Sequence, residues 1–294
     1  MPTTNSIYDK RTRTLDILAH ILIYVCASVS IFILAGIVGY VFYRGVSAVN
    51  LSFLTTVTSS LRQTYGIAGN IVNTIYIIVI TLLISVPFGV GAAIYLNEYA
   101  KPGRLVRLIE FTTETLAGIP SIIFGLFGYV FFGTTLGFKF SILTGSLTLA
   151  IMVLPLITRS TQEALKTVPS SYRSGALGIG ATKWYMIRTI LIPSAMPGII
   201  TGIILSVGRI VGESAALLFT AGSGYLLPKL GNYGEGLIDK VAQPGGTLTI
   251  QLYLWMEKAK YEQAFGIALV LLIIVFGINM LTKYLAHKLN VNKQ

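Results

Sequence analysis

Six long apolar segments constrain this chain more than any other feature of its sequence. A helix needs about 20 consecutive apolar residues to cross the hydrocarbon core of a bilayer. Segments close to or above that length occupy residues 21–42, 67–97, 115–138, 140–158, 189–220 and 263–282. Charged residues make up only 11% of the chain, whereas about a quarter is usual in a soluble domain. We therefore expect an all-α, polytopic membrane protein with six transmembrane helices.

The net charge of +11 does not indicate a nucleic-acid partner. Lys and Arg lie in short segments between the apolar runs, which is the placement that the positive-inside rule explains. Fourteen of them fall in segments that would lie inside if the N-terminus is cytoplasmic, seven would lie outside, and Arg209 lies within a span. The sequence thus predicts a multi-pass protein with both termini in the cytoplasm. The first apolar run is too long for a signal peptide and is expected to remain as a span.

Motifs for enzyme chemistry are absent from the sequence. There is no G-x-x-x-x-G-K-[ST] segment to hold nucleotide phosphates. The two histidines, His20 and His287, lie at opposite ends of the chain, and Cys26 is the only cysteine, so no zinc-type metal site is expected. We predict a chain that is not an enzyme and that holds no cofactor of its own.

The inner loop at residues 159–188 has the pattern of a helix, a break and a second helix. Ser170 or Ser171 can cap a short helix after Pro169, and Gly178 and Gly180 can end it. Thr182 can cap a second helix, which contains Trp184. Apolar side chains on such a loop fit either an amphipathic helix resting on lipid or a docking surface for a cytosolic partner.

Arg209 and Glu213 are the two charged residues of the fifth apolar segment. A charge at bilayer depth costs roughly 2.5–3.5 kcal/mol on insertion scales, so such residues face the bundle interior. Positions i and i+4 share a helix face, which predicts a local ion pair. The pair fits either a structural role or a contact along a substrate pathway, where the planar Arg fork can bind an oxyanion.

A second group of charges flanks the inner loop between the second and third apolar segments. Glu98, Glu110 and Glu114 accompany three basic residues there, and we expect a solvated cluster at the membrane interface. Glu114, at the start of the third apolar segment, is the one residue of this group that we expect to depart from a solvated position.

Pro87, Pro120 and Pro155 lie inside apolar segments, where we expect kinks that neighbouring helices tolerate.

The segment from Ser174 to Pro193 resembles the EAA loop of ABC importer permeases. It reads Ser174-Gly175-Ala176-x-x-x-Gly180 and, after nine intervening residues, Ile190-x-Ile192-Pro193. The usual Glu-Ala pair is replaced by Ser-Gly, which weakens any role for a carboxylate at that step, but the spacing is kept. In that family the loop docks into a groove on the ATPase subunit. The resemblance therefore implies an ATPase-docking role for Ser174, Gly175, Ala176, Gly180, Trp184 and Pro193.

Three further stretches resemble phosphate ABC transporter permeases, most closely the A subunit of the Pst system. They are LAGIPSIIFGLFG at 116–128, AIYLNEY at 93–99, and RIVGESA at 209–215 followed by LFTA at 218–221. The resemblance covers roughly residues 65–285, which we expect to form the permease core with five transmembrane helices. Residues 1–64 are then an N-terminal tail, the first helix and an outer loop, and residues 286–294 are a cytoplasmic tail.

The resemblance implies a bacterial inner-membrane complex that imports inorganic phosphate. A second permease subunit, either a different chain or another copy of this one, would share the pathway. Two cytoplasmic ATPase subunits would bind the ATP, and an extracytoplasmic phosphate-binding protein would deliver the substrate. Arg209 and Glu213 match the intramembrane charges that such permeases need for transport.

Three alternatives remain at the level of the sequence. The nearest is an ABC permease for another tetrahedral oxyanion. A secondary transporter driven by an ion gradient is less well supported, because it gives no reason for the inner loop. A membrane receptor or scaffold without transport is the third.

Overall fold

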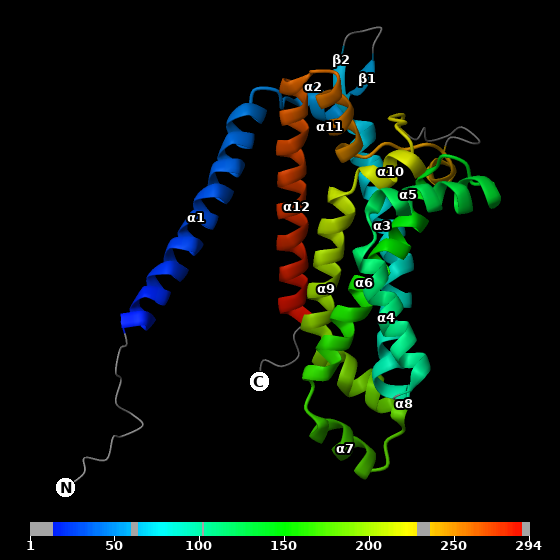
Figure 1. The fold of residues 1–294 in the computed structure, drawn as a ribbon. Coiled ribbons are helices and arrows are strands. Elements are labelled where there is room, and N and C mark those ends of the chain that lie inside the picture. Colours follow the sequence, from blue (N-terminus) through cyan, green and yellow to red (C-terminus); the bar gives the residue numbers. More distant parts are fainter. Residues whose placement is uncertain (1–13, 60–63, 102, 228–235, 290–294) are drawn as a thin grey trace.

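A computed structural model describes residues 14–59, 64–101, 103–227 and 236–289 (Figure 1). Helices dominate it, with one short hairpin. The elements are α1 Thr14–Gly45, α2 Leu51–Thr55, β1 Val57–Ser59, β2 Thr64–Ile67, α3 Ala68–Ile94, η1 Tyr95–Tyr99, α4 Arg104–Gly118, α5 Ser121–Gly128, η2 Tyr129–Thr135, α6 Ile142–Thr167, α7 Ser170–Gly178, α8 Lys183–Met186, η3 Ile187–Leu191, α9 Ile192–Gly212, α10 Ala215–Thr220, η4 Asp239–Ala242, α11 Leu248–Glu257 and α12 Tyr261–Leu289.

Five helical rods in the described part of the chain are long and apolar enough to cross a membrane. They are Asp16–Gly45, Ala68–Tyr99, Ile142–Thr167, Lys183–Gly212 and Tyr261–Tyr284. A bent pair, α4 followed by α5 and η2, meets the same test when it is taken as one span. The all-α, multi-pass fold predicted from the apolar segments is confirmed.

The third predicted span, residues 115–138, contains the kink expected at Pro120, but the bend is sharp enough to divide the segment into two helices. The helix begins earlier, at Arg104, and the chain turns by 103° between Gly118 and Ser121. Pro120 is the cause, because it has no N–H to donate and it disfavours helical geometry at the residue before it. Ile119 accordingly has extended backbone angles, with φ −71° and ψ 132°.

The fifth predicted span, residues 189–220, ends sooner than expected. Helix α9 stops at Gly212, and Glu213 is extended, with φ −81° and ψ 126°. A separate short helix, α10, follows. The charged residues Arg209 and Glu213 therefore do not share one helix.

The core of the bundle is built on α6. It packs against α3 on one side and α9 on the other, and α5 and α10 complete the group. Small residues allow the close approach: a Cβ at Gly89 of α3 would lie 2.7 Å from Ile157 of α6, and one at Gly198 of α9 would lie 2.5 Å from Ala164. Such residues are typical of helix interfaces within membranes.

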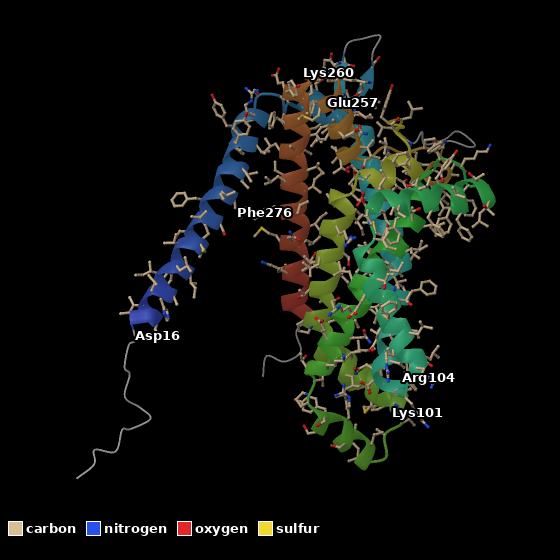
Figure 2. The ribbon with its side chains drawn as sticks, in the orientation of Figure 1. Asp16, Lys101, Arg104, Glu257, Lys260 and Phe276 are labelled. Carbon is tan, nitrogen blue, oxygen red and sulfur yellow. The ribbon has the colours of Figure 1, made fainter. Side chains whose placement is uncertain are left out.

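Helix α1 stands apart from this core. It contacts α12 near Gly45, where Tyr40 and Phe265 form an edge-to-face aromatic pair, and the two helices diverge towards Asp16 (Figure 2). Its most apolar stretch is entirely exposed within this single chain. Burial of that surface therefore requires lipid or another chain.

The bundle has two distinct ends, which we name the α7 end and the α11 end. Lys101 and Arg104 lie towards the α7 end, whereas Glu257 and Lys260 lie at the α11 end (Figure 2). The α11 end also holds the antiparallel β1–β2 hairpin, in which Val57 is opposite Ile67. The start of α1 and the end of α12 both lie towards the α7 end (Figure 1).

Candidate functional site

Arg209 lines a cavity of about 110 Å³ between α4, α6 and α9. The side chain is half-buried, near the end of the membrane helix α9. The other lining residues are Thr113, Glu114, Ala117, Met152, Pro155, Leu156 and Arg159. Pro155 lies inside α6 at this wall, so one of the three predicted membrane prolines borders the cavity.

A second cavity, of about 240 Å³, adjoins the first. The two share Thr113, Glu114 and Arg159. The second adds residues that are mostly polar or charged, which are Leu96, Glu110, Gln162, Glu163 and Lys166. Because Lys166 lies in the last turn of α6, next to the start of α7, the two cavities together connect Arg209 with the α7 end.

The two arginines of this region differ in their partners. Nη1 of Arg159 lies 3.3 Å from the Glu114 carboxylate, and its Nε lies 3.4 Å from that of Glu163. Arg209 forms no ion pair or hydrogen bond within the described residues. Its guanidinium therefore remains available to a charged ligand, whereas that of Arg159 is already partly neutralised.

Glu213 occupies a different position from the one predicted. Its Oε1 accepts a hydrogen bond from the backbone N–H of Ala216, at 3.0 Å, and so caps the start of α10. Its own carbonyl oxygen accepts a hydrogen bond from the hydroxyl of Thr249, at 2.9 Å. The expected Arg209–Glu213 ion pair is not formed, because α9 ends between the two residues. A transport role for Glu213 stays a prediction.

Residues 169–186, which we name the α7–α8 loop, form the helix, break and helix that the sequence indicates. Gly180 has a φ of +86°, which favours glycine. The Thr182 side chain accepts a hydrogen bond from the N–H of Tyr185, at 3.3 Å, and caps α8 as predicted. The predicted serine cap of α7 is wrong, since Pro169 occupies the cap position and no side chain caps that helix.

Part of the α7–α8 loop is anchored and part is free. Ala176 is 5% exposed and packs in an apolar cluster with residues of α6, η3 and α9, including Leu165, Ile187 and Leu191. Ile179 is 88% exposed and Trp184 is 59% exposed, while Ser174, Gly175 and Gly180 are also on the surface and Pro193 is half-buried at the start of α9. An anchored loop that presents bare apolar side chains is suited to binding another protein.

The expectation of a solvated cluster around Glu98 is wrong for that residue. Its side chain is only 5% exposed and forms an ion pair with Arg173 of α7. Glu114 is not the exception that the sequence indicated, because its side chain is 64% exposed, although it borders the Arg209 cavity and pairs with Arg159. Sequence reasoning missed Arg159, for which the available signal was its position directly after the fourth apolar segment and four residues after Pro155.

A family model described as "Binding-protein-dependent transport system inner membrane component" matches residues 85–291. The Bacillus subtilis (strain 168) protein named "Probable ABC transporter permease protein YqgI" is 35% identical over 269 residues, which are 88% of this chain and 91% of that protein. The "Phosphate transport system permease protein PstA" of Haemophilus influenzae is 33% identical over 69% of this chain and 72% of its own length. The protein of that name from Mycobacterium leprae is 36% identical over 69% of this chain and 64% of its own length.

Solved structures agree on the fold. A bacterial alginate ABC transporter chain matches 94% of this chain and 95% of its own length with a TM-score of 0.67, at 14% sequence identity. A chain of the MetNI methionine ABC transporter, in an inward-facing conformation, matches 76% of this chain with a TM-score of 0.56, at 18% identity. At such identities the likeness concerns the arrangement of helices alone.

Proposed function

Because this chain belongs to the family of inner-membrane components of binding-protein-dependent transport systems, we propose that its substrate is inorganic phosphate and that ATP bound by separate subunits drives the import. It is a permease subunit of an ABC importer, embedded in the membrane by several helices. The observation that carries the phosphate assignment is Arg209, a cation without a partner in the described residues, at the wall of the cavity between α4, α6 and α9. Relatives named as phosphate permeases, at 33–36% identity, support the same substrate.

We place the α7 end in the cytoplasm. The α7–α8 loop lies there with its exposed apolar residues, and most of the described Lys and Arg residues outside the spans belong to segments at that end. One of the two ATPase subunits would dock on the loop through Ile179, Trp184 and the surface around Gly180. A phosphate-binding protein would approach the α11 end, and a second permease subunit would complete the pathway.

The cavity residues give each step of passage a physical basis. A phosphate ion that leaves water loses hydration, and the planar fork of Arg209 offsets part of that loss with charge-assisted hydrogen bonds. Glu114 and Glu163 hold Arg159 and keep the net positive charge of the pathway low. Release towards the α7 end requires that the ion is not bound too tightly at any one place along the way.

Switching of the bundle would start at the α7–α8 loop. ATP binding closes the ATPase pair and moves the loop. Helix α9 follows, because α8, η3 and α9 form one continuous helical rod from Lys183 to Gly212. A lever of this kind converts a movement at the membrane surface into a change of packing around Arg209.

Reconstitution tests the proposal directly. The permease pair, the ATPase and the binding protein are placed together in sealed vesicles, and uptake of radiolabelled phosphate is followed with and without ATP. We expect phosphate uptake to require ATP. We also expect that excess sulfate does not reduce this uptake. Competition by sulfate would instead identify a permease for oxyanions in general. Phosphate uptake that an imposed proton gradient drives without nucleotide would contradict the ATP-driven mechanism.

A further inference from the structure

Arg173 of α7 is hydrogen-bonded to two other parts of the chain at once. Its Nε and Nη2 atoms donate to Oε1 of Glu98, at 3.2 and 2.9 Å. Its Nη1 and Nη2 atoms also donate to the carbonyl oxygens of Val168 and Leu165, each at 2.9 Å, where α6 ends. Because Glu98 belongs to η1, which continues α3, one guanidinium group joins α7, α6 and α3.

The contact is largely shielded from water. The Glu98 side chain is 5% exposed and that of Arg173 is 24% exposed. Oε1 of Glu98 also accepts a hydrogen bond from the side-chain amide of Asn97, at 2.6 Å, which fixes the carboxylate further. Charge-assisted bonds of this kind are stronger than neutral ones, and separating the pair would leave a buried charge without a partner. Helix α7 therefore cannot move away from η1 without a large penalty.

A second contact fastens the other half of the α7–α8 loop to the same segment. Nζ of Lys183, the first residue of α8, lies 4.8 Å from the centre of the Tyr99 ring, which is within the range of cation–π interactions. Tyr99 is the last residue of η1, next to Glu98. Both helices of the loop thus hold the end of α3.

The helical rods that meet the loop change geometry at this level. The end of α3 is a π-helical turn, Tyr95–Tyr99, and the segment that leads into α9 is another, Ile187–Leu191. Such turns are rare and occur often at functional sites.

We propose that Arg173 and Glu98 are positioning residues that transmit movement of the α7–α8 loop to α3, so that α3 and α9 move together when ATP is bound. The inference rests on the proposed function, because it needs an ATPase that moves the loop. The contact would transmit the loop's movement to α3, in addition to the transmission through the continuous helical rod of α8, η3 and α9. We name the Arg173–Glu98 contact the clamp. Because α3 and α9 both pack against α6, which lines the Arg209 cavity, the clamp lets the ATPase move two neighbours of α6 instead of one.

The test measures coupling rather than activity alone. Vesicles containing the full complex are assayed for phosphate taken up per ATP hydrolysed, and the purified complex is assayed for the ratio of ATPase to permease. The variants are Glu98→Gln, Arg173→Gln and the double variant. Glu98→Gln keeps a hydrogen-bond acceptor of the same shape, so it folds even if Arg173→Gln does not. The matched control is Arg104→Gln, which removes a charge from an exposed residue at the same end of the bundle.

The expected result is a loss of coupling with assembly intact. Glu98→Gln retains the ATPase at the normal ratio, but its phosphate uptake per ATP falls at least about fivefold, the lower end of typical coupling between distant sites. The double variant is no worse than the more impaired single variant, because both changes break one contact. The control matches the wild type.

Three results would overturn the clamp. They are an unchanged uptake per ATP in Glu98→Gln, a loss of ATPase from that complex, and multiplied defects in the double variant. Failure of the proposed function is separate, since in that case the wild-type complex itself would not take up phosphate with ATP.

Discussion

Arg209 of α9 and Arg159 of α6 line the same cavity, but only Arg159 has acidic partners in the described part of the chain. The difference separates their roles. Arg159 is bound from two sides by Glu114 and Glu163, whereas Arg209 presents its charge to the cavity. An anion in the cavity would therefore gain most from Arg209.

Arg209→Ala should reduce ATP-driven phosphate uptake at least about tenfold, which corresponds to about 1.4 kcal/mol and lies within the range for a charge-assisted contact. Arg209→Lys should also be impaired, because an ammonium group cannot form the paired bonds of a guanidinium fork. Uptake by vesicles is the measurement. The amount of assembled complex should not change, since Arg209 forms no ion pair or hydrogen bond within the described residues. Normal uptake by an assembled Arg209→Ala complex would remove Arg209 from the pathway.

Glu213 should behave as a helix cap. Glu213→Ala removes the acceptor for the N–H of Ala216, and the loss of such a cap typically costs about 1 kcal/mol of stability. Glu213→Gln keeps an acceptor oxygen, so its thermal midpoint and its phosphate uptake should stay close to those of the wild type. The comparison separates shape from charge. If Glu213→Gln were stable but unable to transport, the carboxylate charge itself would be required.

The membrane helices could be predicted because their cause is local. A run of apolar residues long enough for a bilayer specifies a span without reference to its neighbours, and five of the six predicted segments correspond to long helices. The α7–α8 loop was equally local, since Gly180 and Thr182 act on the backbone beside them.

Features that depend on distant parts of the chain were not predicted. The kink expected at Pro120 is present, but neither its size of 103° nor the packing of α5 against α6 and α10 could be predicted from the proline alone. The end of α9 at Gly212 left Glu213 to cap α10, although the i,i+4 spacing of the two charges had indicated a pair. The Glu98–Arg173 contact joins residues 75 positions apart, and no periodic pattern links them.

Gly180 should tolerate no side chain at its present backbone geometry. Its φ of +86° favours glycine, and Gly180→Val would strain the break between α7 and α8 although the space around it is open. We expect at least a severalfold loss of ATPase from the purified complex. Gly178→Ala is the matched control, because it lies in the same exposed segment without a positive φ or a close neighbour, so it should retain the ATPase. Full retention of the ATPase, with normal stimulation of hydrolysis, by the Gly180→Val complex would contradict docking at this loop.

Lys240 should lower the stability of the protein at neutral pH. It lies in η4 at the α11 end, is 1% exposed, and has no ion pair within the described residues. Burial lowers the pKa of its ammonium group from the ordinary value of 10.5. Between the lowered pKa and 10.5 the unfolded chain binds more protons than the folded one, so the free energy of unfolding rises with pH in that window. Below the lowered pKa the folded protein carries the full cost of a buried charge.

Lys240→Met removes that charge and keeps an apolar chain of similar length. The variant should unfold at a higher temperature than the wild type at pH 7, by about 2–4 °C if the gain is about 1 kcal/mol. The advantage should shrink as the pH approaches 10.5, because the wild-type lysine is then neutral in both states. Thermal unfolding of the detergent-solubilised protein at a series of pH values measures both effects, with the exposed Lys258→Met as the control that should show neither. A lower midpoint for Lys240→Met at pH 7 would mean that the charge is stabilised by its surroundings, and would assign Lys240 a role in holding η4 in place.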